Sequence, residues 1–199
     1  MDDARDCFEK ICTNGKFPQY LALFSSITVI NEKNILENQY EIVKQISSPL
    51  RQKKILAFCC SVTSADYQRK VKLMAPYLNK KDVNPSEIAA ELAYHIDLLK
   101  VLAGCTMGLY NITTIETKVQ AMFNYIDVID SMLDSRTLLC IKIQSGIFLY
   151  NSVLEVEMLI PSLAFSPKLW QLMEASVDIL QPSKDILRQI ERNGWDSPT

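Results

Sequence analysis

The stretch ELAYHIDLLKVLAGCTMG, residues 91–108, decides the fold, because it is the most apolar long helical pattern in the chain. Its apolar positions recur every three or four residues, which is the spacing of one face of an α-helix. The first stripe consists of Ile88, Leu92, Ile96, Leu99 and Leu102, and a second stripe beside it of Leu98, Val101 and Cys105. A helix that is apolar over most of its circumference packs against neighbours on several sides. The stretch therefore predicts the central buried helix of the domain.

Capping residues mark both ends of this helix. Asn84 fits the N-cap, Pro85 the first helical position and Glu87 the third, and together they predict a capping box. Gly104 predicts a close crossing with a neighbouring helix, because glycine has no side chain that would hold the two backbones apart. Gly108 predicts the C-terminal stop.

Length and composition fit one large globular domain or two small ones, and we predict a single domain over residues 1–199. Apolar residues make up 48% of the chain and charged residues 22%, which excludes a disordered tail. A net charge of −2 provides no general attraction to nucleic acid or to an anionic membrane, so no nucleic-acid partner is expected. Two short basic clusters are interpreted as solvated helix faces. They comprise Arg51, Lys53 and Lys54, and Arg69, Lys70 and Lys72.

The six cysteines, at positions 7, 12, 59, 60, 105 and 140, form no CxxC pair and have no matching histidines. They fit neither a zinc site nor a disulfide framework, so we expect free thiols in a reducing compartment. Residues 1–6 are acidic and no apolar segment follows them, so no signal peptide is predicted. No run reaches the roughly 18 apolar residues of a membrane-spanning helix. We predict no direct membrane insertion of this segment.

Helical periodicity continues through nearly the whole chain, and only five glycines interrupt it. We therefore predict an all-α fold of about ten helices joined by short turns. The succession of helix pairs favours armadillo- or HEAT-like stacking, and a closed multi-helix bundle is the alternative. Besides the central helix, the predicted helices span residues 2–13, 17–30, 35–46, 50–60, 65–78, 113–123, 125–133, 137–151 and 166–192. The helix over 65–78 is expected to be interrupted or to end near Pro76, and the last helix to break at Gln181-Pro182. Ile141 and Ile143, on either side of Lys142, would also fit a strand.

No set of side chains predicts an enzyme active site. His95 is the only histidine, so a His–His metal pair is impossible, and we interpret it as a structural or surface residue. The glycines at 104 and 108 lack the lysine and the preceding strand of a phosphate-binding loop. Asp127, Asp130 and Asp134 are interpreted as a solvated acidic helix edge, because the EF-hand spacing and its glycine are missing. We predict no catalytic, cofactor-binding or metal-binding residue.

Several short segments carry a family resemblance. In the central stretch these are AYHI at residues 93–96, LL at 98–99, LA at 102–103 and CT at 105–106, followed by Gly108. Elsewhere they are KFP at 16–18, IDVI at 126–129, VLEVEM at 153–158 and LWQL at 169–172. In this order, over roughly residues 16–180, they resemble the central helical domain of inositol trisphosphate receptors, a homology module shared with ryanodine receptors. Met107, Leu109 and Tyr110 depart from the polar residues that the family has around this glycine.

The resemblance implies a non-catalytic, armadillo-like cytosolic domain of a calcium-release channel in the endoplasmic reticulum membrane. In that family such domains relay conformational change between the ligand-binding end and the pore, and their partners are other channel domains or subunits. The inositol phosphate contacts belong to other domains, so no ligand residue is carried over. The chain would then be either a channel fragment or a short relative used elsewhere. The alternative is a free-standing helical scaffold or adaptor in a larger assembly, such as a cytoskeletal or ciliary structure.

The apolar stripe also predicts the effects of two substitutions. Leu99→Asp would place a carboxylate on the buried face, and we expect it to unfold the domain. For His95→Gln, in contrast, we expect folding to remain nearly intact.

Overall fold

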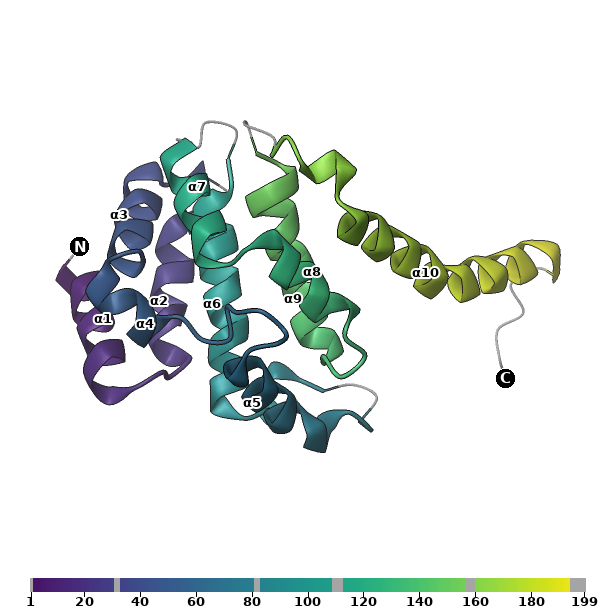
Figure 1. Ribbon diagram of the computed structural model, residues 1–199, viewed down its shortest axis with the longest axis horizontal. Coiled ribbons are helices and arrows are strands. Elements are labelled where there is room, and N and C mark those ends of the chain that lie inside the picture. Colours follow the sequence, from purple (N-terminus) through teal and green to yellow (C-terminus); the bar gives the residue numbers. More distant parts are fainter. Residues whose placement is uncertain (1, 31–32, 81–82, 109–112, 157–159, 194–199) are drawn as a thin grey trace. The chain divides into compact units, whose positions relative to one another are not determined.

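The computed structural model is almost entirely helical, which confirms the predicted all-α fold (Figure 1). The chain divides into two compact units, residues 1–161 and 162–199. The single domain over residues 1–199 stays a prediction, because a compact unit is not by itself an independently folding domain. The structure describes residues 2–30, 33–80, 83–108, 113–156 and 160–193.

The first unit is a series of helices with short connections. Its α-helices are α1 (Asp2–Asn14), α2 (Gln19–Thr28), α3 (Leu36–Ile46), α4 (Pro49–Ile55), α5 (Ala65–Met74), α6 (Ala90–Thr106), α7 (Thr113–Met122), α8 (Tyr125–Leu133) and α9 (Leu139–Leu149). Shorter turns are η1 (Ala75–Tyr77), η2 (Pro85–Glu87) and the π-helical η3 (Tyr150–Leu154), which continues α9. Two-residue strands β1 (Val29–Ile30) and β2 (Lys33–Asn34) pair antiparallel between α2 and α3. The second unit consists of η4 (Leu163–Phe165) and α10 (Pro167–Asn193).

Helices pack in two layers around α6 (Figure 1). In one layer α6 lies between α2 and α9, and these are its most extensive contacts. In the other layer α3 packs against α2, α6 and α7, while α7 packs against α6 and α8 against α9. This pairing fits the predicted stacking of helix pairs, and the armadillo- or HEAT-like order itself stays a prediction.

The sequence correctly predicted α6 as the central buried helix. Leu98 and Leu99, from the two apolar stripes, are both fully enclosed. Gly104 makes the close crossing, because a Cβ at this position would lie 3.2 Å from the Thr28 hydroxyl oxygen on α2. Gly108 follows the helix with a φ of +118°, in the left-handed region that favours glycine. The spacing of apolar residues was sufficient to predict the burial of α6, because a helix that is apolar on all sides must be covered by neighbouring elements on all sides.

The start of α6 differs from the prediction. The Asn84 side chain does accept a hydrogen bond, from the Ser86 backbone N–H at 3.1 Å, but the helix that it caps is the single 3-10 turn η2. Ile88 then adopts an extended conformation, and α6 begins at Ala90 without a side-chain cap. A capping motif satisfies the first N–H groups of a turn whether or not that turn continues as an α-helix.

Two other helix bounds were predicted wrongly. The helix expected over residues 50–60 ends at Ile55, because Leu56 takes extended backbone angles and begins the loop before α5. The break expected at Gln181-Pro182 does not occur, and α10 continues through it to Asn193. A proline inside a helix removes one backbone hydrogen bond, which a helix of 27 residues can tolerate at a local cost.

Candidate functional site

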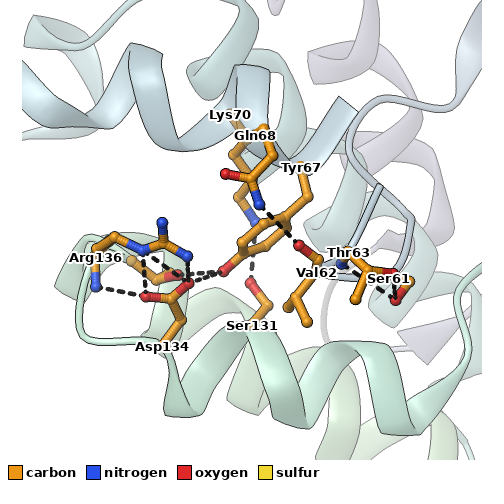
Figure 2. Close-up of polar contacts among 10 residues, drawn as sticks. Ser61, Val62, Thr63, Tyr67, Gln68, Lys70, Ser131, Asp134 and Arg136 are labelled. Carbon is orange, nitrogen blue, oxygen red and sulfur yellow. Dashed lines mark hydrogen bonds and ion pairs between the residues drawn. The ribbon is translucent and has the colours of Figure 1, made fainter. Parts of the chain in front are cut away.

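Polar side chains meet inside the first unit between α5, α6 and α8, although the surroundings are apolar. We call them the Lys70 cluster, and it comprises Tyr67, Lys70, His95, Ser131, Asp134 and Thr137. Figure 2 shows Tyr67 and Lys70 descending from α5 toward Ser131 on α8, with Asp134 and Arg136 beside the tyrosine hydroxyl. A cluster of titratable groups of this kind is a candidate functional site.

Helix α5 directs two of these side chains inward. Its N-cap is Ser64, whose hydroxyl oxygen accepts a hydrogen bond from the backbone N–H of Tyr67 at 3.1 Å. Tyr67, Lys70 and Met74 follow at spacings of three and four residues, so they share one helix face, and all three are fully buried. The lysine therefore occupies an apolar position of an amphipathic helix.

The Lys70 ammonium is held by neutral partners. Its Nζ donates to Ser131 Oγ at 3.1 Å and to His95 Nε2 at 3.2 Å, and it lies 5.4 Å from the centre of the Tyr67 ring. Among the residues that the structure describes, no carboxylate lies within ion-pair distance of Nζ. Burial lowers the pKa of Lys70 to about 8, while Cys59, Cys60 and Asp134 act weakly in the opposite direction. A buried lysine without a counter-charge is an energetic cost that the fold tolerates.

His95 joins this lysine to the loop between α4 and α5. Its Nδ1 lies 2.7 Å from the Ala57 carbonyl oxygen, which can only accept, so Nδ1 carries the proton and Nε2 accepts from Lys70. The pKa of His95 lies well below its usual range, first because of burial and second because of the neighbouring Lys70 charge. The imidazole is therefore neutral at pH 7.

The same loop receives two more side-chain hydrogen bonds. Tyr94 donates its hydroxyl to the Ile55 carbonyl at 2.9 Å, and the Lys16 ammonium donates to the Leu56 carbonyl at 2.5 Å. Together with the His95 contact, three successive carbonyls are thereby satisfied, that of the last residue of α4 and those of the first two loop residues. Phe58 follows with a φ of +56°, a strained angle for a residue with a side chain. Its ring packs edge-on against the His95 ring at 5.8 Å, which holds it in place.

Asp134 forms the outer end of the cluster. Its carboxylate accepts from the Tyr67 hydroxyl at 3.1 Å and from the Arg136 guanidinium at 2.7 Å. The hydrogen bonds of Arg136 lower the pKa of Asp134 to about 2. The Thr137 hydroxyl lies 3.2 Å from the Tyr67 oxygen and completes the connection between α5 and the segment after α8.

The cluster contains the residue types of an active site but not the access that a substrate needs. Lys70 and His95 are 0% exposed and Ser131 is 1% exposed, so no substrate atom can reach their polar atoms. Their donors and acceptors are already engaged with one another. Burial also raises the pKa of the nearby Cys59 thiol to about 12, which keeps it protonated and weakly nucleophilic. The geometry therefore ties three helices and a loop together.

Sequence reasoning missed the centre of this cluster. Lys70 was interpreted as part of a solvated basic face with Arg69 and Lys72, and this is wrong, because Lys70 is fully buried while its two neighbours are exposed. The available signal was its spacing, since it lies three residues after Tyr67 and four before Met74. His95 is structural and buried, the first of the two possibilities left open for it.

The other candidates from the sequence contribute no site. Asp134 turns toward Tyr67 and Arg136 rather than lining an acidic edge with Asp127 and Asp130. Within the described ranges, no group of three or more His, Cys, Asp or Glu side chains could hold a metal ion. The six cysteines are free thiols.

Comparisons with known proteins add no relative. No protein-family model matches the chain, and no curated protein is significantly similar to it. In the part of the chain that the structure describes, no helix is both long and apolar enough to cross a membrane.

Proposed function

We propose that this chain is a non-catalytic helical scaffold that serves as a regulatory and coupling domain of an inositol trisphosphate-gated calcium-release channel. The observation that carries the proposal is the ordered series of segments that resemble this family, among which residues 93–106 form most of α6. A coupling domain must transmit a displacement from one neighbour to the next through packed elements. Helix α6 lies in one layer and packs against the other, and its His95 connects it through Lys70 to α5 and α8.

The proposal includes a location and a set of partners. The domain would be a cytosolic segment of a channel in the endoplasmic reticulum membrane, and its partners would be other channel domains or subunits. The centre of the Lys70 cluster supports a role without catalysis, because the buried Lys70, His95 and Ser131 offer no accessible polar atom to a substrate. No cofactor is proposed.

A free-standing helical scaffold or adaptor in a cytoskeletal or ciliary assembly is the second candidate. Like a channel domain, it would need an exposed surface for protein contacts, and a row of exposed apolar side chains on α9 and η3 is such a surface. Both candidates need protein partners. They differ in whether the chain is a segment of a larger channel polypeptide or a separate protein.

Cell fractionation separates the two. An antibody against residues 2–30 is used on cells that express the protein, followed by alkaline extraction of the membrane fraction. For a channel domain, we expect the signal in a polypeptide far larger than 199 residues that stays in the extracted membranes. A product of 199 residues that sediments with filaments would contradict the channel and support the scaffold.

A calcium measurement then tests coupling directly. Leu99→Asp introduced into the chromosomal copy should abolish calcium release evoked by inositol trisphosphate in permeabilised cells, because Leu99 is fully buried in α6. The control is Lys72→Met on the exposed side of α5, which should leave release unchanged. Normal release with the Leu99→Asp protein would reject the channel role.

A further inference from the structure

Helix α9 has two apolar faces, and only one of them is packed within the first unit. Ile141 and Phe148 are fully buried, and the helix packs against α6 and α8. On the opposite side is a row of exposed apolar side chains that continues into η3. We call it the α9 row, and it consists of Leu139 (66% exposed), Ile143 (57%), Ile147 (45%), Tyr150 (52%) and Leu154 (41%).

The composition of α9 is that of a helix covered on both sides. Its sequence, LCIKIQSGIFL, contains a single charged residue, Lys142. A helix that is apolar around most of its circumference is normally enclosed, whereas a surface helix has a charged outer face. Scattered exposed apolar residues need no explanation, but a continuous row along one helix marks a docking surface.

The exposed area suits a second copy of the same chain. With roughly 200 Å² for each large side chain, the exposed fractions of the α9 row correspond to roughly 500 Å² per copy. Two copies that completely cover each other's row bury about 1,000 Å², which is the minimum for a biological interface and corresponds to a weak dimer. A two-fold axis requires only that one patch contact the same patch on the second copy, which a continuous apolar row allows.

Charges at the two ends of the row set the orientation of the second copy. Lys142 lies near its start, and the exposed Glu155 lies just beyond its end. Glu155 is close enough to Tyr150 for its carboxylate to raise the pKa of that hydroxyl. Antiparallel packing brings the Glu155 end of each copy to the Lys142 end of the other, whereas parallel packing would place like charges together.

We propose that the α9 row is a homodimer interface, in which α9 and η3 of two copies pack antiparallel across a two-fold axis. The inference concerns the chain in solution and does not depend on the proposed channel role. A channel domain and a free-standing scaffold could both associate in this way.

Analytical ultracentrifugation of the full chain over a range of concentrations tests the interface. The wild-type chain should approach twice the monomer mass as concentration rises, and Ile143→Asp/Ile147→Asp should weaken association by on the order of 100-fold. Both isoleucines are exposed, so this variant should keep the wild-type circular dichroism and thermal melt. Leu50→Asp is the matched control, because Leu50 is 86% exposed on α4 and should not affect association. A wild-type chain that stays monomeric, or a dimer that survives the double substitution, would overturn the proposal.

Charge reversal tests the antiparallel orientation. Glu155→Lys alone and Lys142→Glu alone should each weaken association roughly five- to tenfold, because each change acts twice across the two-fold axis. The double reversal Lys142→Glu/Glu155→Lys should restore association close to the wild-type value. Equal association of all three variants and wild type would rule out this arrangement of the two copies, even if the dimer depends on Ile143 and Ile147.

Discussion

Replacing Lys70 by methionine should change how the stability of the protein depends on pH. Methionine has a similar length and carries no charge, so it can occupy the same buried space. In the folded chain burial lowers the pKa of Lys70 to about 8, whereas the ordinary value, which the unfolded chain retains, is 10.5. This difference corresponds to about 3 kcal/mol of folding free energy, because one pH unit is worth about 1.4 kcal/mol.

The direction of the effect follows from the protons bound in each state. At pH 7 the Lys70 amine is protonated in both states, and its buried charge costs stability. Between pH 8 and pH 10.5 the folded chain has lost this proton while the unfolded chain still binds it. The free energy of unfolding contributed by Lys70 therefore rises with pH over this window. The cysteines and tyrosines that also titrate there are common to both proteins, so their effects cancel in the difference.

Urea unfolding followed by far-ultraviolet circular dichroism, under reducing conditions, measures this difference. The free energy of unfolding of wild type minus that of Lys70→Met should increase by about 3 kcal/mol between pH 8 and pH 10.5. The control Lys72→Met changes an exposed lysine on the same helix, and its difference from wild type should stay constant. A constant difference for Lys70→Met as well would refute the reasoning, because it would mean that the Lys70 amine is as well solvated in the folded chain as in the unfolded chain.

Four further substitutions test the local geometry by thermal or urea unfolding. Leu99→Asp should cost more than about 4 kcal/mol and leave the chain unfolded, because Leu99 is fully buried. His95→Gln should lower the free energy of unfolding by about 2–3 kcal/mol, because both ring nitrogens form hydrogen bonds. This differs from the expectation from the sequence, and a decrease of less than about 0.5 kcal/mol would contradict it. Ser64→Ala should cost about 1 kcal/mol through the lost N-cap of α5, whereas Ser64→Thr should retain most of it. Gly108→Ala should cost about 1–2 kcal/mol, because φ is +118° and the new Cβ would lie 2.6 Å from the Asn34 amide nitrogen; an unchanged melt would argue against this turn.

Prediction from sequence succeeded for elements whose evidence is local. The bounds of α8 were predicted to the residue, and α3 and α7 within one residue, because helical periodicity and flanking polar residues lie within a few positions of each other. It failed at the start of α6 and at Pro182 in α10, where the same local signals are compatible with more than one outcome. A cap can end a single turn, and a proline can be tolerated inside a long helix.

The candidate site was less predictable than the fold. Tyr94 and His95 were placed on the central helix, but their partners lie almost forty residues earlier, at the carbonyl of Ile55, which ends α4, and the carbonyl of Ala57 in the following loop. No periodicity describes a loop, so nothing in the sequence placed these carbonyls beside α6.

The sequence by itself determined that the chain is helical and that α6 is central, because apolar spacing is a property of neighbouring positions and requires no knowledge of the partner. Only the tertiary structure decided the fate of Lys70. Its burial depends on α6 and α8 supplying His95 and Ser131, which lie 25 and 61 residues further along the chain. A lysine on a helix is normally solvated. It is buried only where neutral groups from distant parts of the chain accept hydrogen bonds from its ammonium group and exclude water.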